Sequence, residues 1–403
     1  MKSIRKCKIL VSGLVLPATA ALLATFFFVI LPGKPVAGEG LSGTRLLACP
    51  PSMPPQSGPT LIVNTTVMTT CDGICGPDHC TLGEAIHLAN ELAGENTIEL
   101  GAGAIYTVTA ADNGVNGFPL ITSTMTLHGN DATITRPPAA PNFRFLSITS
   151  DGTLTLAQVT IRNGRLTSWP TQGGAVFTAG RLNISESVFA YNHCDAEDTR
   201  GGAIFIASGE VSIKNTTFYS NTATSYMSYG GAIYSAGGQI DILNSTFVDN
   251  LAGGNSYDLG GAIYSSSAVT ITNSTFSGNR AKDHGGTIFV LSGGSVLLRN
   301  TIIANGSGAA SCNGNVVDGG GNLSWPDSSC PGLNQDPKLS PLANNGGANL
   351  TMALQAGSPA IHHADPAICP VTDQRGWPRL LQGLCDSGAY EWSWLAFQPF
   401  ISK

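Results

Sequence analysis

The chain has 403 residues and a net charge of −6. Only 11% of its residues are charged, and 49 residues are glycine. This composition is typical of short strands joined by tight turns and argues against a mainly helical protein. Basic residues form no block after the first eight positions, so the sequence also argues against nucleic acid as a partner, which would need a basic surface.

The N-terminus has the pattern of an export signal. The basic stretch MKSIRKCK precedes an apolar run of 23 residues from Ile9 to Leu31, a pairing typical of signal peptides. We predict that residues 1–38 are a signal peptide or, if uncleaved, a membrane anchor, since a run of this length spans a bilayer. Residues 39–60 carry several prolines and glycines and predict a linker. We therefore expect an exported protein, extracellular or at the cell surface, that meets a membrane only through this segment.

Nine of the ten cysteines lie outside the export segment, and export permits disulfides. A pairing of Cys49 with Cys71 would leave Cys194 free, and sequence alone does not decide connectivity. Short spacings favour three pairs, namely Cys75 with Cys80, Cys312 with Cys330 and Cys369 with Cys385. A zinc site is a weaker alternative. Its ligands would be Cys71, Cys75, His79 and Cys80, but the spacing of these residues differs from that of structural zinc sites. We expect no metal and no cofactor.

Residues 61–100 predict a short helix before the first strands. Thr81 and Glu84 have the spacing of a capping box, and Gly94 is placed to end the helix. Apolar residues recur between them at helical spacing, at Leu82, Ala85, Ile86, Ala89 and Leu92. Because a stack of strands has an open end with unpaired backbone groups, we expect this helix to cover that end.

The same stretch resembles a known module. CTLGEAIHLAN is similar to the CSLREA-type module at the N-terminus of many exported bacterial repeat proteins, with Thr81 in place of its Ser and Gly83 in place of its Arg. The resemblance implies an N-terminal cap over residues 61–100.

Residues 101–305 contain a repeat in which one phrase occurs five times. The copies begin at Gly173, Gly201, Gly230, Gly260 and Gly285, in steps of 28, 29, 30 and 25 residues. A repeat of this length predicts a stacked array in which each unit buries its apolar face against its neighbours. Apolar pairs at the same spacing begin well before the first double glycine, so we predict about seven coils.

Each copy contains three short strands separated by glycine or asparagine turns, which predicts an all-β, right-handed parallel β-helix. Burying each apolar side chain in an aligned column would contribute about 1.5–3 kcal/mol. The expected aliphatic column is Val176, Ile204, Ile233, Ile263 and Ile288. The expected aromatic core column is Phe189, Phe218, Phe247 and Phe276, continued by Ile302.

Two asparagine columns predict turn ladders, since asparagine tolerates left-handed backbone and its amide can bond to the next rung. One column is Asn215, Asn244, Asn273 and Asn300, and the other is Asn192, Asn221, Asn250, Asn279 and Asn305. The combined GGA(I/V) and Phe-x-x-Asn pattern resembles the repeats of the chlamydial polymorphic outer-membrane proteins. That resemblance implies a surface β-helix protein and says less about an activity.

The C-terminal part, residues 306–403, changes character. It resembles the choice-of-anchor Q module of bacterial surface proteins, on the residues Pro341–Gly347, Gly357–Ile361, Asp373–Gly376 and Gly388–Glu391. His362-His363-Ala364 departs from that pattern. We expect Asp373 and Arg375 to form a structural ion pair. The final WSWLAFQPFISK is interpreted either as a last cap or as an attachment signal.

One acidic cluster is a candidate for chemistry. Asp195, Glu197 and Asp198 lie beside His193 and Arg200, and polysaccharide lyases and hydrolases on β-helices need clustered carboxylates. No second coil repeats several acids there, so we favour a solvated loop and assign no catalytic residue. A polysaccharide lyase or glycoside hydrolase stays an alternative, as does a passive structural envelope protein.

A second aromatic column directly follows the aliphatic one, at Phe177, Phe205, Tyr234, Tyr264 and Phe289. Because side chains alternate between faces along a strand, these rings should point outward. An exposed aromatic strip favours a binding surface, so we predict adhesion or contact with a polysaccharide or a cell-surface partner. The alternative is that the rings stack on one another only for stability.

Overall fold

The computed structural model describes residues 60–67, 75–168, 171–308, 310–379 and 383–392. The predicted signal peptide or anchor, nearly all of the linker and the last residues from 393 lie outside this part, as do Cys49 and Cys71.

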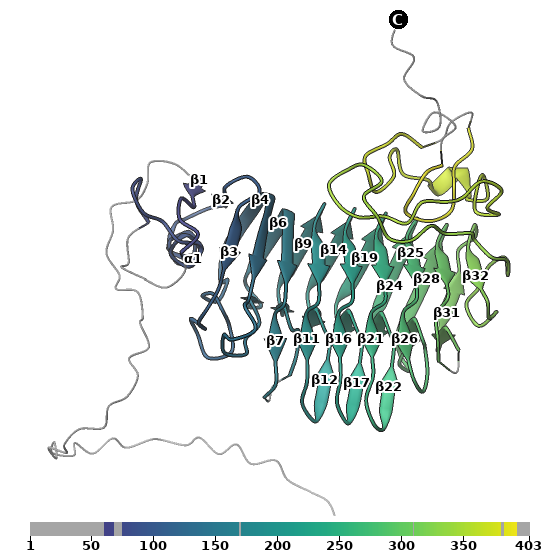
Figure 1. The fold of residues 1–403 in the computed structure, drawn as a ribbon, viewed down its shortest axis with the longest axis horizontal. Helices are drawn as coiled ribbons and strands as arrows, with labels where there is room; N and C mark the ends of the chain where they lie inside the picture. Colours follow the sequence, from purple (N-terminus) through teal and green to yellow (C-terminus); the bar gives the residue numbers. More distant parts are fainter. Residues whose placement is uncertain (1–59, 68–74, 169–170, 309, 380–382, 393–403) are drawn as a thin grey trace, which may run out of the picture. The chain divides into compact units, whose positions relative to one another are not determined.

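The described chain is a parallel β-solenoid of about seven coils (Figure 1). Strands of successive coils pair in parallel, one coil above the next, so each residue lies beside its counterpart about 29 positions later. This confirms the predicted stack of parallel coils. The right-handed winding and the boundaries of the three predicted modules stay predictions.

Four sheets run along the stack. The long sheet contains β1 (Thr60–Ile62), β2 (Asn96–Glu99), β3 (Ile105–Thr107), β4 (Thr124–Thr135), β6 (Thr153–Arg162), β9 (Arg181–Ser185), β10 (Val188–Ala190), β14 (Glu210–Lys214), β15 (Thr217–Tyr219), β19 (Gln239–Leu243), β20 (Thr246–Val248), β24 (Ala268–Thr272), β25 (Thr275–Ser277), β28 (Ser295–Arg299), β29 (Ile302–Ala304), β31 (Val316–Asp318) and β32 (Leu323–Trp325). The seven-stranded sheet contains β5 (Leu146–Ile148), β8 (Val176–Thr178), β13 (Ile204–Ile206), β18 (Ile233–Ser235), β23 (Ile263–Ser265), β27 (Ile288–Val290) and β30 (Cys312–Asn313).

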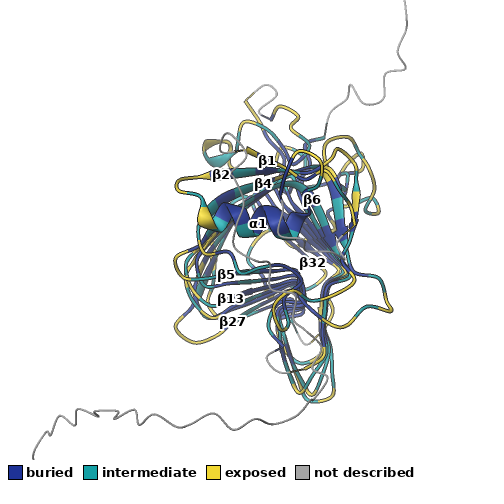
Figure 2. Cartoon of the chain, turned by 90° about the vertical axis from the view of Figure 1, so that its left-hand side faces the viewer, coloured by how far each residue is buried: buried dark blue, intermediate teal, exposed yellow. Residues whose placement is uncertain are grey.

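Two smaller sheets complete the coils. The five-stranded sheet contains β7 (Arg165–Leu166), β11 (His193–Cys194), β16 (Thr222–Ala223), β21 (Leu251–Ala252) and β26 (Arg280–Ala281). The three-stranded sheet, which we call the lobe, contains β12 (Asp198–Arg200), β17 (Met227–Tyr229) and β22 (Tyr257–Leu259). Figure 1 shows the lobe along the lower edge of the stack, and Figure 2, which looks along the stack, shows the buried residues lining its inside.

The double glycine that opens each copy has a steric cause. The first glycine has a φ between 59° and 70° in all five copies, a left-handed conformation that favours glycine. A Cβ there would lie 2.0–2.4 Å from the carbonyl oxygen three residues later. A Cβ on the second glycine would lie 2.0–2.6 Å from a backbone oxygen of the next coil. Both positions must therefore be glycine for the coils to stack this closely.

The predicted core columns are present, with one correction. The five aliphatic residues beginning at Val176 are in register and fully buried. The phenylalanines from Phe189 to Phe276 stack with ring centroids 4.6–5.0 Å apart. The column continues with Ile303, not with Ile302 as expected, because Ile302 pairs with Thr275 and belongs to the outward side of the sheet.

One asparagine column is the predicted ladder. The side chains of Asn192, Asn221, Asn250 and Asn279 are fully buried, and the Nδ2 of each of the first three donates to the Oδ1 of the next at 2.9–3.0 Å. Asn305 does not belong to it, contrary to expectation: it is exposed and has the left-handed backbone of the preceding position. The ladder pairs amides that would otherwise be buried without partners, which is costly.

The other asparagine column is a ladder only in part, since Nδ2 of Asn300 donates to Oδ1 of Asn273 at 3.2 Å, and it has a second role that was not predicted. Its four members have the expected left-handed backbone, with φ of 44–49°, but three of their amides bind the C-terminal tail. Asn244 donates to the carbonyl of Thr372 (2.8 Å), Asn273 to Asp386 (3.2 Å) and Asn300 to Asp365 (3.1 Å). In earlier coils the same position is Gln158 or Glu186, also left-handed. Tail docking therefore explains why asparagine is used here.

The tail, residues 334–391, lies over the later coils (Figure 1) and is anchored by buried arginines. Arg379 donates to Glu391 (3.0 Å) and to Oδ1 of Asn244 (3.1 Å). Arg375 forms the predicted ion pair with Asp373 (2.6 Å) and lies 3.6 Å from the ring centroid of Tyr390. A small apolar cluster joins tail and coils and consists of Ile302, Ala304, Leu323, Leu354, Ala360 and Tyr390.

The anchor contains more carboxylates than guanidinium groups. Asp373, Asp386 and Glu391 are buried beside Arg375 and Arg379. Burial, reinforced by the charge of Asp386, raises the pKa of Glu391 to about 7. Burial also raises the pKa of Asp386. Glu391 therefore holds its proton to a higher pH than an ordinary glutamate does.

Helix α1 (Leu82–Glu91) begins at the predicted capping box. The backbone N–H of Glu84 donates to Thr81 Oγ1 (3.2 Å), and that of Thr81 donates to Glu84 Oε2 (2.8 Å). Its buried side chains belong to the same core cluster as the first strands. Whether α1 closes the stack stays a prediction. A second, short helix of the 3-10 type, η1 (Pro366–Ile368), lies in the tail. No helix of the described part is long and apolar enough to cross a membrane.

The structure joins all three predicted cysteine pairs, Cys75–Cys80, Cys312–Cys330 and Cys369–Cys385. Cys194 is free and buried in the five-stranded sheet, where burial raises the pKa of its thiol to about 12. Such a thiol is protonated and unreactive near neutral pH.

Replacing Asn244 by glycine tests the docking role of its column. Glycine keeps the left-handed backbone, so Asn244→Gly removes only the amide contacts to Thr372 and Arg379. We expect the free energy of unfolding in urea to fall by about 1–3 kcal/mol. Asp131→Gly makes the same kind of backbone change at an exposed left-handed residue of β4, whose side chain bonds to no described residue, and should change stability by less than about 0.5 kcal/mol. Equal effects would show that asparagine serves the turn alone.

The charge cluster predicts a pH dependence of stability. The pKa of Glu391 is about 7 in the folded protein, above its ordinary value of 4.5. Because the folded state binds the proton more tightly, this contribution is complete below about pH 4.5 and is lost as the pH rises through 7. We expect the unfolding free energy to fall by roughly 2 kcal/mol between pH 5 and 8. Glu391→Gln should flatten this slope, whereas Glu210→Gln on the exposed surface should leave it unchanged.

Candidate functional site

The five rings proposed as a binding strip form one column, but their faces are not available. Phe177, Phe205, Tyr234, Tyr264 and Phe289 lie on consecutive strands of the seven-stranded sheet. Neighbouring ring centroids are 4.7–5.4 Å apart, and the ring planes differ by only 4–15°. Each ring face is therefore turned toward the next ring, and only ring edges point away from the column.

The lobe covers much of this column. Arg200 and Tyr229 occupy the same register position at the ends of β12 and β17. The Arg200 guanidinium lies 5.6 Å from the ring centroid of Tyr234, and Tyr229 packs edge-on against Tyr264 at 5.2 Å. Phe205 and Tyr264 retain only 4% and 6% of their exposure. The expectation of an exposed aromatic strip is therefore wrong for Phe205 and Tyr264, and the loops before three of the five double glycines fold back as strands β12, β17 and β22. Phe177, Tyr234 and Phe289 are partly buried.

Enclosure also changes the chemistry of the tyrosines. Burial, with smaller contributions from Tyr234 and Tyr229, raises the pKa of Tyr264 to about 12. Burial likewise raises the pKa of Tyr234. These phenols are protonated at all physiological pH values. The geometry favours the alternative interpretation of the column, in which stacked rings hold the lobe against the coils.

The acidic cluster is divided among separate partners. Both carboxylate oxygens of Asp198 accept hydrogen bonds from Arg200, at 3.1 and 2.6 Å. Asp195 pairs with Arg165 at 3.4 Å and lies 3.6 Å from His193. Burial, followed by the charge of Arg165, lowers the pKa of His193. The carboxylates of Asp195 and Asp198 are thus engaged in structural ion pairs and do not face each other as an acid–base pair.

A cleft of about 740 Å³ opens beside β12. Tyr226 is 59% exposed at its edge, and Tyr257 on the next coil is 58% exposed. The lining combines hydroxyl groups, carboxylates, a thioether and a tyrosine ring, from Thr167, Ser168, Thr171, Ala196, Glu197, Asp198, Tyr226 and Met227. Trp169, which the sequence also places in this region, lies outside the described residues.

In the sequence, Tyr226 and Tyr257 lie in the loops that precede the double glycines, but no pattern there indicates that hydroxyl groups would gather beside Tyr226 in a cleft. The segments that form the lobe strands, Asp198–Arg200, Met227–Tyr229 and Tyr257–Leu259, share no alternation of apolar and polar residues. The sequence therefore carries no clear signal for this additional sheet.

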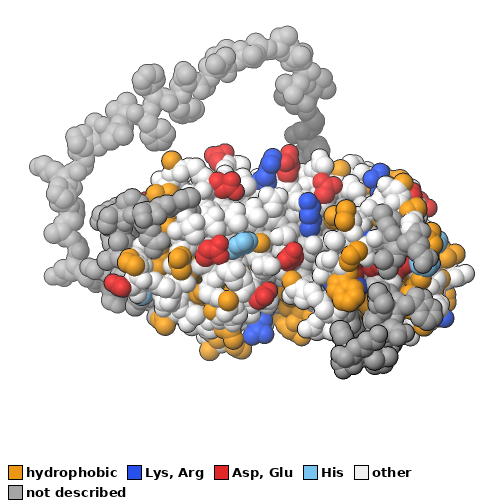
Figure 3. Space-filling model, turned by 90° about the horizontal axis from the view of Figure 1, so that it is seen from above, with side chains coloured by type: hydrophobic (Ala, Val, Ile, Leu, Met, Phe, Trp, Pro, Cys, Tyr) orange, Lys and Arg blue, Asp and Glu red, His pale blue; other side chains and the backbone are white. Residues whose placement is uncertain are grey.

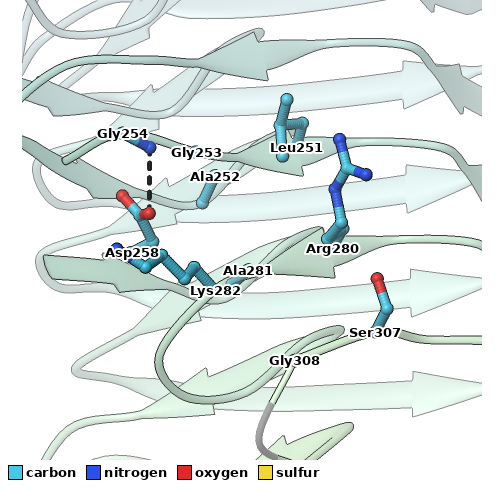
Figure 4. A pocket seen from close by; sticks show the side chains of 10 residues that line it. All are labelled: Leu251, Ala252, Gly253, Gly254, Asp258, Arg280, Ala281, Lys282, Ser307 and Gly308. Carbon is cyan, nitrogen blue, oxygen red and sulfur yellow. Dashed lines mark hydrogen bonds between the residues drawn. The ribbon is translucent and has the colours of Figure 1, made fainter. Parts of the chain in front are cut away.

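A second, smaller pocket of about 310 Å³ lies where the lobe ends (Figure 4). Figure 4 shows Asp258 and Lys282 on one side and Arg280 on the other. Asp258 is fully buried and accepts a hydrogen bond from the backbone N–H of Gly254 at 2.9 Å. Burial raises the pKa of this carboxyl group. The pocket exists because the next coil advances by 25 residues instead of 30 and adds no further lobe strand.

The charge distribution gives no sign of a polyanion site on the side of the tail. Seen from that side, acidic and basic side chains are scattered singly over the described surface (Figure 3). No group of three or more histidine, cysteine, aspartate or glutamate residues in the described part could hold a metal ion.

One known family model matches part of the repeat region. The model of the Chlamydia polymorphic membrane protein repeat matches residues 215–236 and 273–291. These segments contain members of the phenylalanine, aliphatic and asparagine columns, so the match supports a β-helix repeat protein of outer-membrane or surface type. No curated protein and no solved structure matches the chain. The CSLREA-like and choice-of-anchor Q-like modules stay predictions.

The two groups of tyrosines should respond differently to truncation. Tyr234→Ala removes a ring stacked on both sides, and we expect it to lower the unfolding free energy by about 2–4 kcal/mol. Tyr226→Ala removes an exposed ring and should change it by less than about 0.5 kcal/mol. Urea unfolding monitored by circular dichroism measures both. A similar loss in the two variants would contradict the structural role of the column.

Proposed function

We propose that this chain is a non-catalytic, exported surface protein whose lobe cleft binds a carbohydrate chain, as in adhesion. The observation that carries the proposal is the exposed ring of Tyr226 at the edge of a cleft lined by hydroxyl and carboxylate groups. An open aromatic face packs against the apolar face of a sugar ring, and hydroxyl and carboxylate oxygens accept its hydroxyl protons. Tyr257 on the next coil would extend the contact to a second sugar unit.

The proposal prefers a neutral or amine-bearing glycan. The exposed Glu197 forms no ion pair with any described residue, while Asp198 is neutralised by Arg200. The cleft therefore has an excess of negative charge, which repels uronic acids and sulfated sugars. This electrostatic argument also disfavours the alternative of a pectin-type lyase, whose substrate is a polyuronate.

The ion pairs weigh against hydrolysis as well. A glycoside hydrolase needs two carboxyl groups about 5–10 Å apart that are free to protonate a leaving group and to attack or activate water. In this cleft Asp198 is held by Arg200 through both oxygens. Protonating it would cost the energy of that pair, so a binding role fits the cleft better.

The same proposal includes the finer architectural expectations. Export through residues 1–38, right-handed winding and closure of the first coil by α1 all suit a protein that presents its lobe outside the cell. The repeat match supports the surface location, and the buried face of α1 supports its closing role.

Glycan retention tests this proposal. The full chain without residues 1–38 should bind members of a printed array of neutral and amine-bearing glycans. Tyr226→Ala should weaken that binding at least tenfold, because it removes the stacking ring at the cleft. Tyr191→Ala is the matched control, since Tyr191 is also exposed, at 52%, but lies on another face.

Three outcomes would count against it. Binding that survives Tyr226→Ala would place the site elsewhere. New reducing ends released from a bound glycan would support the hydrolase alternative. An array without any binder would leave the passive structural role as the better account.

A further inference from the structure

One outward column of the long sheet continues from covered coils onto open ones. Its members are in register from coil to coil, and they are Thr133, Thr160, Val188, Thr217, Thr246, Thr275 and Ile302. The tail covers the column from Thr217 onward, where every member is at most 1% exposed. The three members before Thr217 are only partly buried.

On the covered coils, threonine hydroxyls bind a polypeptide. Thr217 donates to the carbonyl of Leu350 at 2.7 Å, and Thr246 donates to Oε1 of Gln374 at 2.5 Å. Thr275 accepts from the backbone N–H of Ala389 at 2.9 Å. The column thus has one kind of occupant in this structure, an irregular polypeptide that exchanges hydrogen bonds with successive hydroxyls.

The tail stops covering the outward column near Ser187 and Asn215. Among the described tail residues, Asn349 reaches furthest toward the first coils, donating to the carbonyls of Ser187 (3.4 Å) and Asn215 (2.5 Å). A cavity of about 210 Å³ lies at this edge, between Thr160 and Val188 on the sheet and tail residues 347–350. This outward column, together with the cavity beside it, forms a groove that is open at the point where the tail leaves it.

A guanidinium that bonds to none of the described residues lies beside the open part. Arg162 lies in the adjacent outward column, in register with Ala190 and, one coil further, Tyr219. Its side chain forms no hydrogen bond or ion pair with any described residue, and its Nε is enclosed. Tyr191 packs edge-on against Tyr219 at 5.1 Å and is 52% exposed. A planar guanidinium beside tyrosine rings is suited to bind a carboxylate through two hydrogen bonds.

We propose that the open part of this column, Thr133, Thr160 and Val188 together with Arg162, is a docking site for an extended peptide segment of a partner protein carrying an aspartate or glutamate. The groove is continuous with the tail interface, which supplies the mode of binding, and Arg162 supplies the charge selectivity. Three rungs about 4.8 Å apart give a length of about 10 Å, enough for three or four extended residues.

A displayed library of random decapeptides, selected against the full chain without residues 1–38, tests this site. Enriched peptides should carry an aspartate or glutamate, and their affinity should fall when salt is raised, because the attraction is partly electrostatic. Arg162→Glu should weaken their binding at least tenfold. Arg280→Glu is the matched control, because Arg280 is an exposed arginine on the five-stranded sheet, and it should leave binding unchanged.

Other results would overturn the proposal. A library without enrichment would show that the groove accepts no peptide, and an equal loss in both arginine variants would indicate general charge attraction. Enriched peptides displaced by an acidic oligosaccharide but insensitive to Thr160→Ala would assign Arg162 to a glycan site. Thermal unfolding of each variant checks its fold, and Tyr191→Ala provides a second probe that leaves the sheet backbone intact.

Discussion

The parallel register between coils is the constraint on which the rest of the structure depends. Each strand is hydrogen-bonded to its counterpart one coil away, so every residue must be compatible with its own equivalent about 5 Å above and below. Isoleucine and phenylalanine satisfy this by packing, and the buried asparagines satisfy it by bonding amide to amide. The double glycines satisfy it by having no Cβ where two backbones meet. Repetition in the sequence is the direct consequence of this geometry.

The same register explains why the aromatic column is an unsuitable binding strip. Aligned rings at one position per coil stack face to face, which stabilises the coils and removes those faces from solvent. Exposed rings therefore lie outside the stacked columns. The lobe offers two of them, because Tyr226 before β17 and Tyr257 at the start of β22 keep more than half of their exposure.

The tail adds a second level of organisation. It lies across several coils and uses the outward residues of each, the amides of Asn244, Asn273 and Asn300 and the hydroxyls of the threonine column. A lateral cover of this kind ties together coils that otherwise contact only their neighbours. It also divides one continuous face into a covered and an open part, and Arg162, beside the open part, bonds to no residue of the described chain through its side chain.

The sequence by itself determined the stack, its period, the inward columns and the helix at Thr81, because each follows from local spacing or from a repeated pattern. Short spacing favoured the three cysteine pairs, and the structure joined them. It could not separate Ile302 from Ile303, since both are apolar and only the pairing with Thr275 and Phe276 decides which one enters the core. Only the tertiary structure decided that the loops before the double glycines fold back over Phe205 and Tyr264, and that asparagines with left-handed backbone serve the tail. Those contacts join residues up to 135 positions apart, and no local pattern records such a distance.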